Sequence, residues 1–317
     1  MSVRPIRILV TGRQGQVVRS LIERGALHHD IEMLPLGRPD LDLLDTETIA
    51  AAILGSRPDA IVSAAAFTAV DLAETETVAA HKCNGLAPGE IGRAAAELGV
   101  PVVHLSTDYV FDGQNAAPYA ETDPTAPMGV YGCTKLSGEK RLASATGNYA
   151  ILRTGWVYSP FGKNFLKTML RLAASRDDLA VVDDQVGTPT SALDIADAVI
   201  AVVRNLIADP DERLRGVFHM SGAGQASWAD FAVAIFAASQ LAGGPVAAVS
   251  RISSRDYPTP AQRPANSRLD CAKLAGIHGV ALPEWKVSSA EVVRQVLGDM
   301  RRSSAAVKAS QDIQSPQ

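Results

Sequence analysis

Short apolar, β-rich runs alternate with longer Ala-rich stretches from the start of the chain. The pattern predicts strands at Ile6–Val10, Ile31–Leu36, Ala60–Ala66, Val102–Ser106, Tyr149–Tyr158 and Leu179–Val182. It predicts helices at Val17–Arg24, Thr46–Leu54, Thr77–Leu98, Lys135–Leu142, Phe165–Ala174 and Asp194–Leu206. Strands that alternate with helices of this length form right-handed crossovers. The sequence therefore predicts an α/β fold, with a Rossmann-type doubly wound parallel sheet.

The regular alternation of strand and helix patterns ends near Gly216. GVFHMSG is followed by an Ala-rich helix from Trp228 and by the irregular stretch DYPTPAQRPANSR from Asp256. Irregular loops beyond the carboxyl edge of the strands are where α/β proteins place substrate recognition. We predict a nucleotide-binding domain over residues 1–215 and a smaller C-terminal substrate-binding lobe, mainly 216–300 with interleaved segments. Residues 301–317 are too polar to offset their ordering entropy and are predicted to form a mobile tail.

Composition excludes several classes of protein. The 317 residues are 47% hydrophobic and 20% charged, which is enough to bury a large core. A net charge of −4 argues against a nucleic-acid surface, so a small-molecule partner is expected. Cys83, Cys133 and Cys271 form no disulfide framework or zinc motif, and no apolar run approaches a membrane span. A cytoplasmic protein without a membrane anchor is predicted.

A glycine turn joins the first strand to the first helix. TGRQGQVV places Gly12 and Gly15 where a tight turn lets backbone N–H groups approach a pyrophosphate at the helix N-terminus. Val18 occupies the third fingerprint position, which usually holds a glycine that allows close helix packing. The strand before and the helix after the turn favour a dinucleotide site over a plain glycine turn.

The end of the second strand bears on cofactor choice. NAD-selective sites usually carry an acid there, whereas LPLGRPDLD presents Arg38, which can pair with a 2′-phosphate. NADPH is therefore favoured, NADH stays possible, and a solvated loop arginine is an equally good reading of Arg38 alone. Residues after the second and third strands are candidates for the adenine and ribose ends: Asp42, Leu43, Ala65, Ala66 and Phe67.

YGCTK places Tyr131 and Lys135 four residues apart, on one face of a helix. Lowering a tyrosine pKa from about 10 to about 7 requires roughly 4 kcal/mol. One ammonium about 4 Å away at an effective dielectric near 20 supplies about that much. Tyr131 is thus predicted to be an acid–base residue tuned by Lys135, although a surface tyrosine stacked on a lysine stem would show the same spacing.

Three further residues are candidates for contacts with a substrate. Thr107 ends the fourth strand, where its hydroxyl can reach a carbonyl oxygen beside Tyr131, and Ser106 is a competing candidate. Asp108 can bind a sugar hydroxyl, and Trp156 can wall a sugar ring. A turn aspartate and a core aromatic are the plainer readings of these two residues.

Several motifs then occur in order over about residues 6–270: LVTGRQGQV, SAAAFTAVDLAE, STDYVFDG, ETDPTAPMGVYGCTKLSGEK, LRTGWVYS, VDDQVGTPT and YPTPAQRPANSRLD. Together they resemble the dTDP-4-dehydrorhamnose reductases, which are extended short-chain dehydrogenases/reductases. The resemblance implies NADPH-dependent reduction of dTDP-6-deoxy-L-lyxo-4-hexulose to dTDP-L-rhamnose for cell-surface polysaccharide synthesis. It also suggests a homodimer.

The resemblance also implies roles for individual residues. Gly15, Gln16 and Val17 would lie at the cofactor phosphates. Tyr131 would donate the proton, and Lys135 would tune it and hold the cofactor ribose. The remaining expected contacts are Thr107 at the carbonyl, Asp108 and Trp156 at the sugar, and Arg263 of RPANSRLD at a substrate phosphate, where a solvated loop arginine is an even alternative.

Some members of this family hold a divalent ion through a glutamate on the first helix. Val18, Arg19 and Ser20 offer no carboxylate, so we predict no metal. Two rival functions stay open. A dehydratase or epimerase of the same fold also needs the tyrosine and lysine, but Tyr109 stands where dehydratases place a second acid. A non-catalytic NADPH-binding regulatory subunit would not need to keep Tyr131, Lys135 and Thr107 together.

Overall fold

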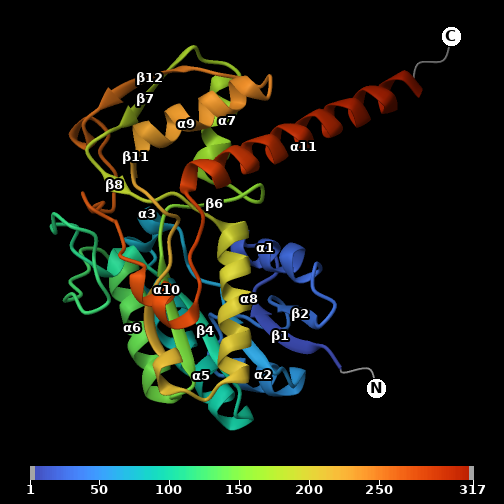
Figure 1. The fold of residues 1–317 in the computed structure, drawn as a ribbon, viewed down its shortest axis with the longest axis vertical. Coiled ribbons are helices and arrows are strands. Elements are labelled where there is room, and N and C mark those ends of the chain that lie inside the picture. Colours follow the sequence, from blue (N-terminus) through green and yellow to red (C-terminus); the bar gives the residue numbers. More distant parts are fainter. Residues whose placement is uncertain (1–3, 314–317) are drawn as a thin grey trace.

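A six-stranded parallel sheet forms the centre of the larger lobe (Figure 1), with strand order β10-β5-β4-β3-β1-β2. This computed structural model describes residues 4–313, and their side chains as far as residue 302. The strands are β1 (Ile6–Thr11), β2 (Ile31–Leu36), β3 (Ala60–Ser63), β4 (Val102–Thr107), β5 (Tyr149–Thr154) and β10 (Gly216–His219). The strand order reverses beside β1, and such a reversal opens a crevice at the carboxyl ends of the strands. The predicted α/β fold class is confirmed.

Helices cover both faces of the sheet because each strand is apolar on both sides. Ile8 and Val10 of β1 belong to a core shared with Ile195 of α8, whereas Leu9 packs with Ile91 of α5. The helices are α1 (Gln16–Gly25) and α8 (Ala192–Ala208) on one face, and α2 (Ile49–Ser56), α5 (Ala87–Leu98) and α6 (Val130–Ala145) on the other. Strands buried on both faces are typical of parallel sheets.

Two predicted strands end earlier than their apolar runs suggest. β3 stops at Ser63 because the Thr11 side-chain oxygen accepts the backbone N–H groups of Ala64 and Ala65, each at 3.0 Å, which takes them out of the ladder. The predicted strand Tyr149–Tyr158 is broken at Trp156, whose φ of 51° is left-handed and incompatible with a strand. Both breaks lie at the crevice edge of the sheet.

The prediction that Leu179–Val182 completes the main sheet is wrong. That segment forms β7 (Asp178–Val182), which pairs in parallel with β12 (Ala248–Ile252) in the smaller lobe. The sixth strand of the main sheet is β10, within the GVFHMSG segment, and it pairs with β5. The chain has already left the main sheet when it reaches β7, because α7 (Phe165–Ala173) packs in the smaller lobe.

The smaller lobe lies above the carboxyl edge of the sheet in Figure 1 and has its own core around Tyr158, Phe231 and Trp285. Its other elements are β6 (Val157–Tyr158), β8 (Val186–Gly187), β9 (Thr190–Ser191), β11 (Ala226–Ser227), α9 (Trp228–Leu241) and α11 (Trp285–Ile313). Each lobe contains residues from before and after residue 215. The predicted boundary between two domains at residue 215 therefore stays a prediction. The predicted tail is helical as far as Ile313, residues 314–317 lie outside the described part, and its mobility stays a prediction.

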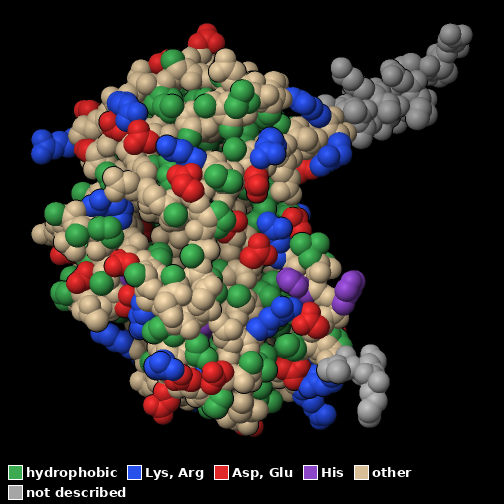
Figure 2. Space-filling model, viewed as in Figure 1, with side chains coloured by type: hydrophobic (Ala, Val, Ile, Leu, Met, Phe, Trp, Pro, Cys, Tyr) green, Lys and Arg blue, Asp and Glu red, His purple; other side chains and the backbone are tan. Residues whose placement is uncertain are grey.

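Short elements complete the chain: α3 (Val70–Ala73), α4 (Thr77–Ala80), a π-helical segment (His81–Leu86), α10 (Ala272–His278) and 3-10 turns at Asp108–Val110, Glu212–Leu214 and Ser254–Asp256. Figure 2 shows Lys and Arg interspersed with Asp and Glu over the visible face, with neither sign forming a continuous patch. Within residues 4–313, no helix has both the length and the apolar character that a bilayer crossing requires.

Candidate active site

A cavity of about 680 Å³ opens at the carboxyl ends of β1, β3, β4 and β5. Most of the residues singled out from the sequence line it: Gly12, Gly15, Gln16, Val17, Ala65, Ala66, Thr107, Asp108, Tyr131, Lys135 and Trp156. They come from segments far apart in the chain, which the sheet brings to one edge. This cavity is therefore the candidate active site.

The glycine turn forms one wall of the cavity. Gly12 has a φ of +100°, and a Cβ there would lie 3.3 Å from the Ala65 side chain, so both conformation and space favour glycine. Gly15 caps α1 without a side-chain hydrogen bond, and the first turn of α1 carries no acidic residue. The helix thus presents its N-terminal N–H groups unopposed. Val18 is 2% exposed and packs in the core, so α1 accommodates the valine.

Gln16 connects this wall to the loop after β6. Its side-chain oxygen accepts hydrogen bonds from the Ser159 hydroxyl at 2.9 Å and from the Asn164 amide at 2.8 Å. Asn164 and the neighbouring Lys163 also line the cavity. Neither residue was predicted from the sequence, although Asn164 directly precedes α7 as its N-cap, a position that helix-start signals identify.

Tyr131, Thr107 and Asp108 form a connected group on the opposite wall. The Thr107 hydroxyl donates to Asp108 Oδ1 at 2.9 Å and is close enough to the Tyr131 phenol to lower its pKa. The competing candidate, Ser106, donates its hydroxyl to the buried carboxylate of Glu139. Thr107 is thus the hydroxyl beside the phenol.

Burial raises the pKa of Tyr131 in this structure, the neighbouring Thr107 hydroxyl lowers it, and the Asp108 carboxylate raises it further. Lys135 is not among the groups that shift the Tyr131 pKa in this structure, and its role in tuning Tyr131 stays a prediction. The Lys135 ammonium donates to the Leu105 carbonyl of β4 at 2.6 Å. Burial lowers the pKa of Lys135 itself to about 8.

Asp108 is 3% exposed, and burial raises its pKa to about 6 against hydrogen bonds from Thr107 and Ser267. Its Oδ2 has no hydrogen-bond partner among the described residues. Gly155 packs directly on this carboxyl, and a Cβ there would lie 2.6 Å from it. A buried acceptor that lines a cavity without a partner is suited to receive a hydroxyl from a bound molecule.

Two contacts outside the cavity fix α6, the helix that carries Tyr131. The carboxylate of Glu74, which follows α3, accepts the Val130 N–H at 2.9 Å and so caps the helix from a distant segment. Glu139 forms a bidentate ion pair with Arg153 of β5 at 2.7 and 3.0 Å, and both side chains are at most 5% exposed. The motifs SAAAFTAVDLAE and LSGEK thus include residues that position the helix.

Trp156 projects from the break between β5 and β6. Its ring stacks on Trp228 of α9 with centroids 3.6 Å apart and an interplanar angle of 4°. A Cβ on Gly187 would lie 2.4 Å from the indole, so a glycine is required behind it. The tryptophan pair joins the two lobes at the edge of the cavity.

Arg263 lies beside a second cavity of about 820 Å³ in the smaller lobe. Its guanidinium pairs with Asp71 at 2.8 Å and donates to the Tyr109 hydroxyl at 3.2 Å. Tyr109 lines both cavities and meets the Tyr131 ring edge-on at 5.6 Å. The two cavities therefore adjoin through one aromatic side chain.

Four predicted cofactor residues lie outside the cavity lining. Arg38 is exposed, and among the described residues its guanidinium has no hydrogen-bond or ion-pair partner, so it is free to bind an anion. Asp42 accepts the Leu44 N–H in a local turn, and Leu43 belongs to the core. The backbone of Phe67 is held by the side chain of Asn84. The roles of all four stay predictions.

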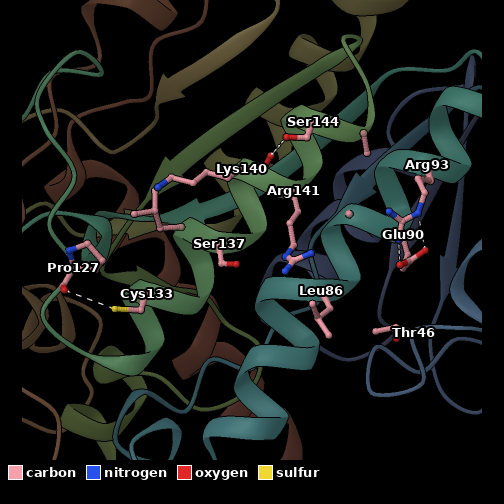
Figure 3. Close-up of a pocket in the computed structure, with 13 residues that line it drawn as sticks. Thr46, Leu86, Glu90, Arg93, Pro127, Cys133, Ser137, Lys140, Arg141 and Ser144 are labelled. Atoms are coloured by element: carbon pink, nitrogen blue, oxygen red, sulfur yellow. Dashed lines mark hydrogen bonds and ion pairs between the residues drawn. The ribbon is translucent and has the colours of Figure 1, made fainter.

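Cavity size alone does not identify the site, because a hollow of about 700 Å³ lies between α5 and α6 (Figure 3). Cys133, Ser137 and Ser144 line it, and the 100° step of a helix places them opposite Tyr131 and Lys135. Its walls hold a surface ion pair between Glu90 and Arg93. Within the described residues, no three His, Cys, Asp or Glu side chains gather as a metal site, and the absence of a metal stays a prediction.

Comparison with known proteins places these features in a wider context. The family model for the RmlD substrate binding domain matches residues 6–297. A dTDP-4-dehydrorhamnose reductase of Sinorhizobium fredii is 49% identical over 292 residues, which cover 92% of this chain and 98% of that protein. The crystal structure of a dTDP-4-dehydrorhamnose reductase from Clostridium acetobutylicum superposes with a TM-score of 0.84 at 36% identity, covering 92% and 99% of the chains. The enzyme from Bacillus anthracis in complex with NADP gives 0.82 at 30% identity, covering 91% and 98%.

Proposed function

This chain belongs to the dTDP-4-dehydrorhamnose reductase family, and from that premise and the site geometry we propose that it reduces a dTDP-4-keto-6-deoxy sugar with NADPH. The family predicted from the motifs is confirmed. The proposed reaction converts dTDP-6-deoxy-L-lyxo-4-hexulose to dTDP-L-rhamnose, which supplies cell-surface polysaccharide synthesis. The observation that carries the proposal is the convergence of Tyr131, Thr107 and Lys135 on the cavity that begins at the glycine turn.

The residues present fit a dinucleotide. The uncapped N-terminus of α1 and the close approach of Gly12 to Ala65 form a cradle for a pyrophosphate, because N–H groups and the helix dipole favour negative charge. Gly15, Gln16 and Val17 would hold the phosphates, and Lys163 adds a positive charge to the same cavity. Arg38 would pair with the 2′-phosphate. When bound, the nicotinamide supplies the hydride that reaches the sugar C4.

Three side chains, Tyr131, Thr107 and Lys135, would carry out the proton transfer to the substrate. Burial and the Asp108 carboxylate keep the Tyr131 phenol protonated, which is the form that donates a proton to the developing C4 alkoxide. The Thr107 hydroxyl, which lines the same cavity beside the phenol, is placed to share the carbonyl oxygen. The Lys135 ammonium holds positive charge near the reacting atoms and stabilises the phenolate that remains after proton transfer.

The rest of the substrate would extend from the sugar subsite toward the second cavity. Trp156 offers a ring face at the boundary between the two lobes. Asp108 Oδ2 is an acceptor without a partner among the described residues and can receive a sugar hydroxyl. Beyond Tyr109, the lining of the 820 Å³ cavity includes Arg263 and Arg176, whose guanidinium groups are suited to a diphosphate, together with the carboxylates of Asp71, Asp178 and Asp256. Asp71 holds Arg263 in place until a phosphate competes for it.

Replacement of Tyr131 by Phe tests the proposal directly. The ring and its contact with Tyr109 are kept while the hydroxyl is deleted, so NADPH binding and the melting temperature should stay at the wild-type values. Loss of general acid catalysis should lower kcat by about 10²–10⁴-fold with the dTDP-keto sugar. Near-wild-type turnover with a rate-limiting chemical step would refute the assignment.

The proposal also includes an oligomeric state and a cellular location. We propose a homodimer, in keeping with the resemblance of the motifs, and a cytoplasmic location, in keeping with three free cysteines. Sedimentation of the purified protein measures the first, and fractionation of cells that produce it measures the second.

A further inference from the structure

A chain of buried polar contacts lies behind Lys135 and takes no part in the mechanism derived above. Lys135 Nζ lies 3.4 Å from Nε2 of His104 in β4, and His104 Nδ1 lies 2.9 Å from the Ser63 hydroxyl at the end of β3. The three side chains are each at most 2% exposed. They link α6, β4 and β3 beneath the floor of the cavity.

The hydrogen-bond donors and acceptors around His104 determine which ring nitrogen carries the proton. A lysine ammonium has three donors and no acceptor, so His104 Nε2 must present its lone pair to Nζ. The ring proton then sits on Nδ1, and the Ser63 oxygen accepts it. Burial and the neighbouring Lys135 charge lower the pKa of His104 well below its ordinary value, so the ring stays neutral.

The same contacts direct the ammonium. One N–H of Lys135 goes to the Leu105 carbonyl at 2.6 Å and a second faces His104, both on the β4 side. Tetrahedral geometry leaves the third N–H for the cavity that Lys135 lines. Two fixed acceptors determine this direction, whereas the Leu105 carbonyl alone would leave the group free to rotate.

We propose that His104 is a positioning residue of the reductase: held by Ser63 in the Nδ1–H tautomer, it aims the Lys135 ammonium at the bound cofactor and Tyr131. The inference rests on the proposed function, since it requires that Lys135 serve the reaction. His104 acts only through Lys135 and touches neither cofactor nor substrate.

The tautomer provides the first test, because it is measured in the protein without turnover. Nitrogen-15 NMR of the ring should show a protonated Nδ1 and an unprotonated Nε2 at neutral pH. Ser63→Ala deletes only a hydroxyl, so the protein should fold, and the Nδ1 resonance should lose its hydrogen-bond shift. A protonated Nε2, or an Nδ1 resonance unaffected by Ser63→Ala, would overturn the assignment.

A mutant cycle provides the second test. His104→Leu should weaken NADPH binding, measured by fluorescence titration, and lower kcat, each by about tenfold, the value of a hydrogen bond to a charged group. His104→Gln places an amide oxygen near the Nε2 position and should restore both values to within about threefold. In a Lys135→Met background, His104→Leu should change neither value by more than about twofold, because coupled residues are not additive.

The controls separate positioning from general stability. His278→Leu removes another buried histidine, one bonded to the Leu214 carbonyl, and should lower the melting temperature without changing NADPH affinity. Equal losses from His104→Leu in both backgrounds would show that His104 does not act through Lys135. If Lys135→Met and Tyr131→Phe were themselves fully active, the proposed function would fail instead.

Discussion

Replacement of Glu139 by Gln tests the buried ion pair that ties α6 to the sheet. Glu139 and Arg153 are 4% and 5% exposed in their side chains and share two hydrogen bonds. The amide keeps the shape of the side chain but removes its charge. Arg153 would then be a buried cation without a counterion, and its Nη1 already has no partner among the described residues.

Removing one partner of such a pair costs about 3–5 kcal/mol. Typical folding free energies are about 5–15 kcal/mol, so the loss is a large fraction of the total stability. At about 1.4 kcal/mol per tenfold, the folded-to-unfolded ratio should fall by more than about a hundredfold. Glu139 also raises the pKa of Lys135, which burial has lowered to about 8. Glu139→Gln should therefore lower that pKa further and move the alkaline limb of the rate profile to lower pH.

Urea denaturation followed by circular dichroism measures the first effect, and steady-state rates across the alkaline range measure the second. Glu90→Gln is the matched control, because it breaks an ion pair with Arg93, which is 61% exposed, and should cost at most about 1 kcal/mol. Combining Glu139→Gln with Arg153→Met should recover part of the loss, since no buried charge is left unpaired. A Glu139→Gln protein as stable as the Glu90→Gln control would refute the reasoning.

Three further predictions follow from named contacts. Because burial raises the Asp108 pKa to about 6, kcat/KM should fall as pH drops through about 6, where the carboxylate acceptor is lost; Asp108→Asn should abolish that step in a pH–rate profile. Arg38→Ala should raise the KM for NADPH far more than that for NADH, and equal changes would exclude a 2′-phosphate contact. Glu74→Ala removes the acceptor from the Val130 N–H and should cost about 1 kcal/mol of stability in thermal melts, whereas Glu74→Gln, which keeps an acceptor oxygen, should lose less.

Local sequence patterns predicted most of the main sheet because each strand is set by its own spacing of apolar residues. The partner of a strand is not a local property. Leu179–Val182 reads as one more strand of the alternating series, and only its pairing with Ala248–Ile252 assigns it to the smaller lobe. The β3 strand ends at Ser63 for a similar reason, because Thr11, far earlier in the chain, takes the next amides.

The site residues that belong to a short sequence motif could be predicted. Tyr131, Lys135 and the glycine turn follow from short spacings that the fold then brings together. His104 and Glu74 act through contacts with distant segments, and a lone histidine in an apolar strand gives no local signal of its partner. The spacing of Tyr131 and Lys135 predicts that the two side chains are neighbours, but it does not show the burial that raises the Tyr131 pKa.

The stacked indoles at the lobe boundary give the molecule an optical reporter. The chain has three tryptophans, and two of them, Trp156 and Trp228, are parallel and in contact, with one on each lobe. Rings in such close contact interact in their excited states, so the tryptophan emission spectrum should change in either Trp→Phe variant. Reduced nicotinamide absorbs where tryptophan emits, so energy transfer from the pair should follow cofactor binding in real time. The contact that joins the lobes also makes their separation visible in solution without any added label.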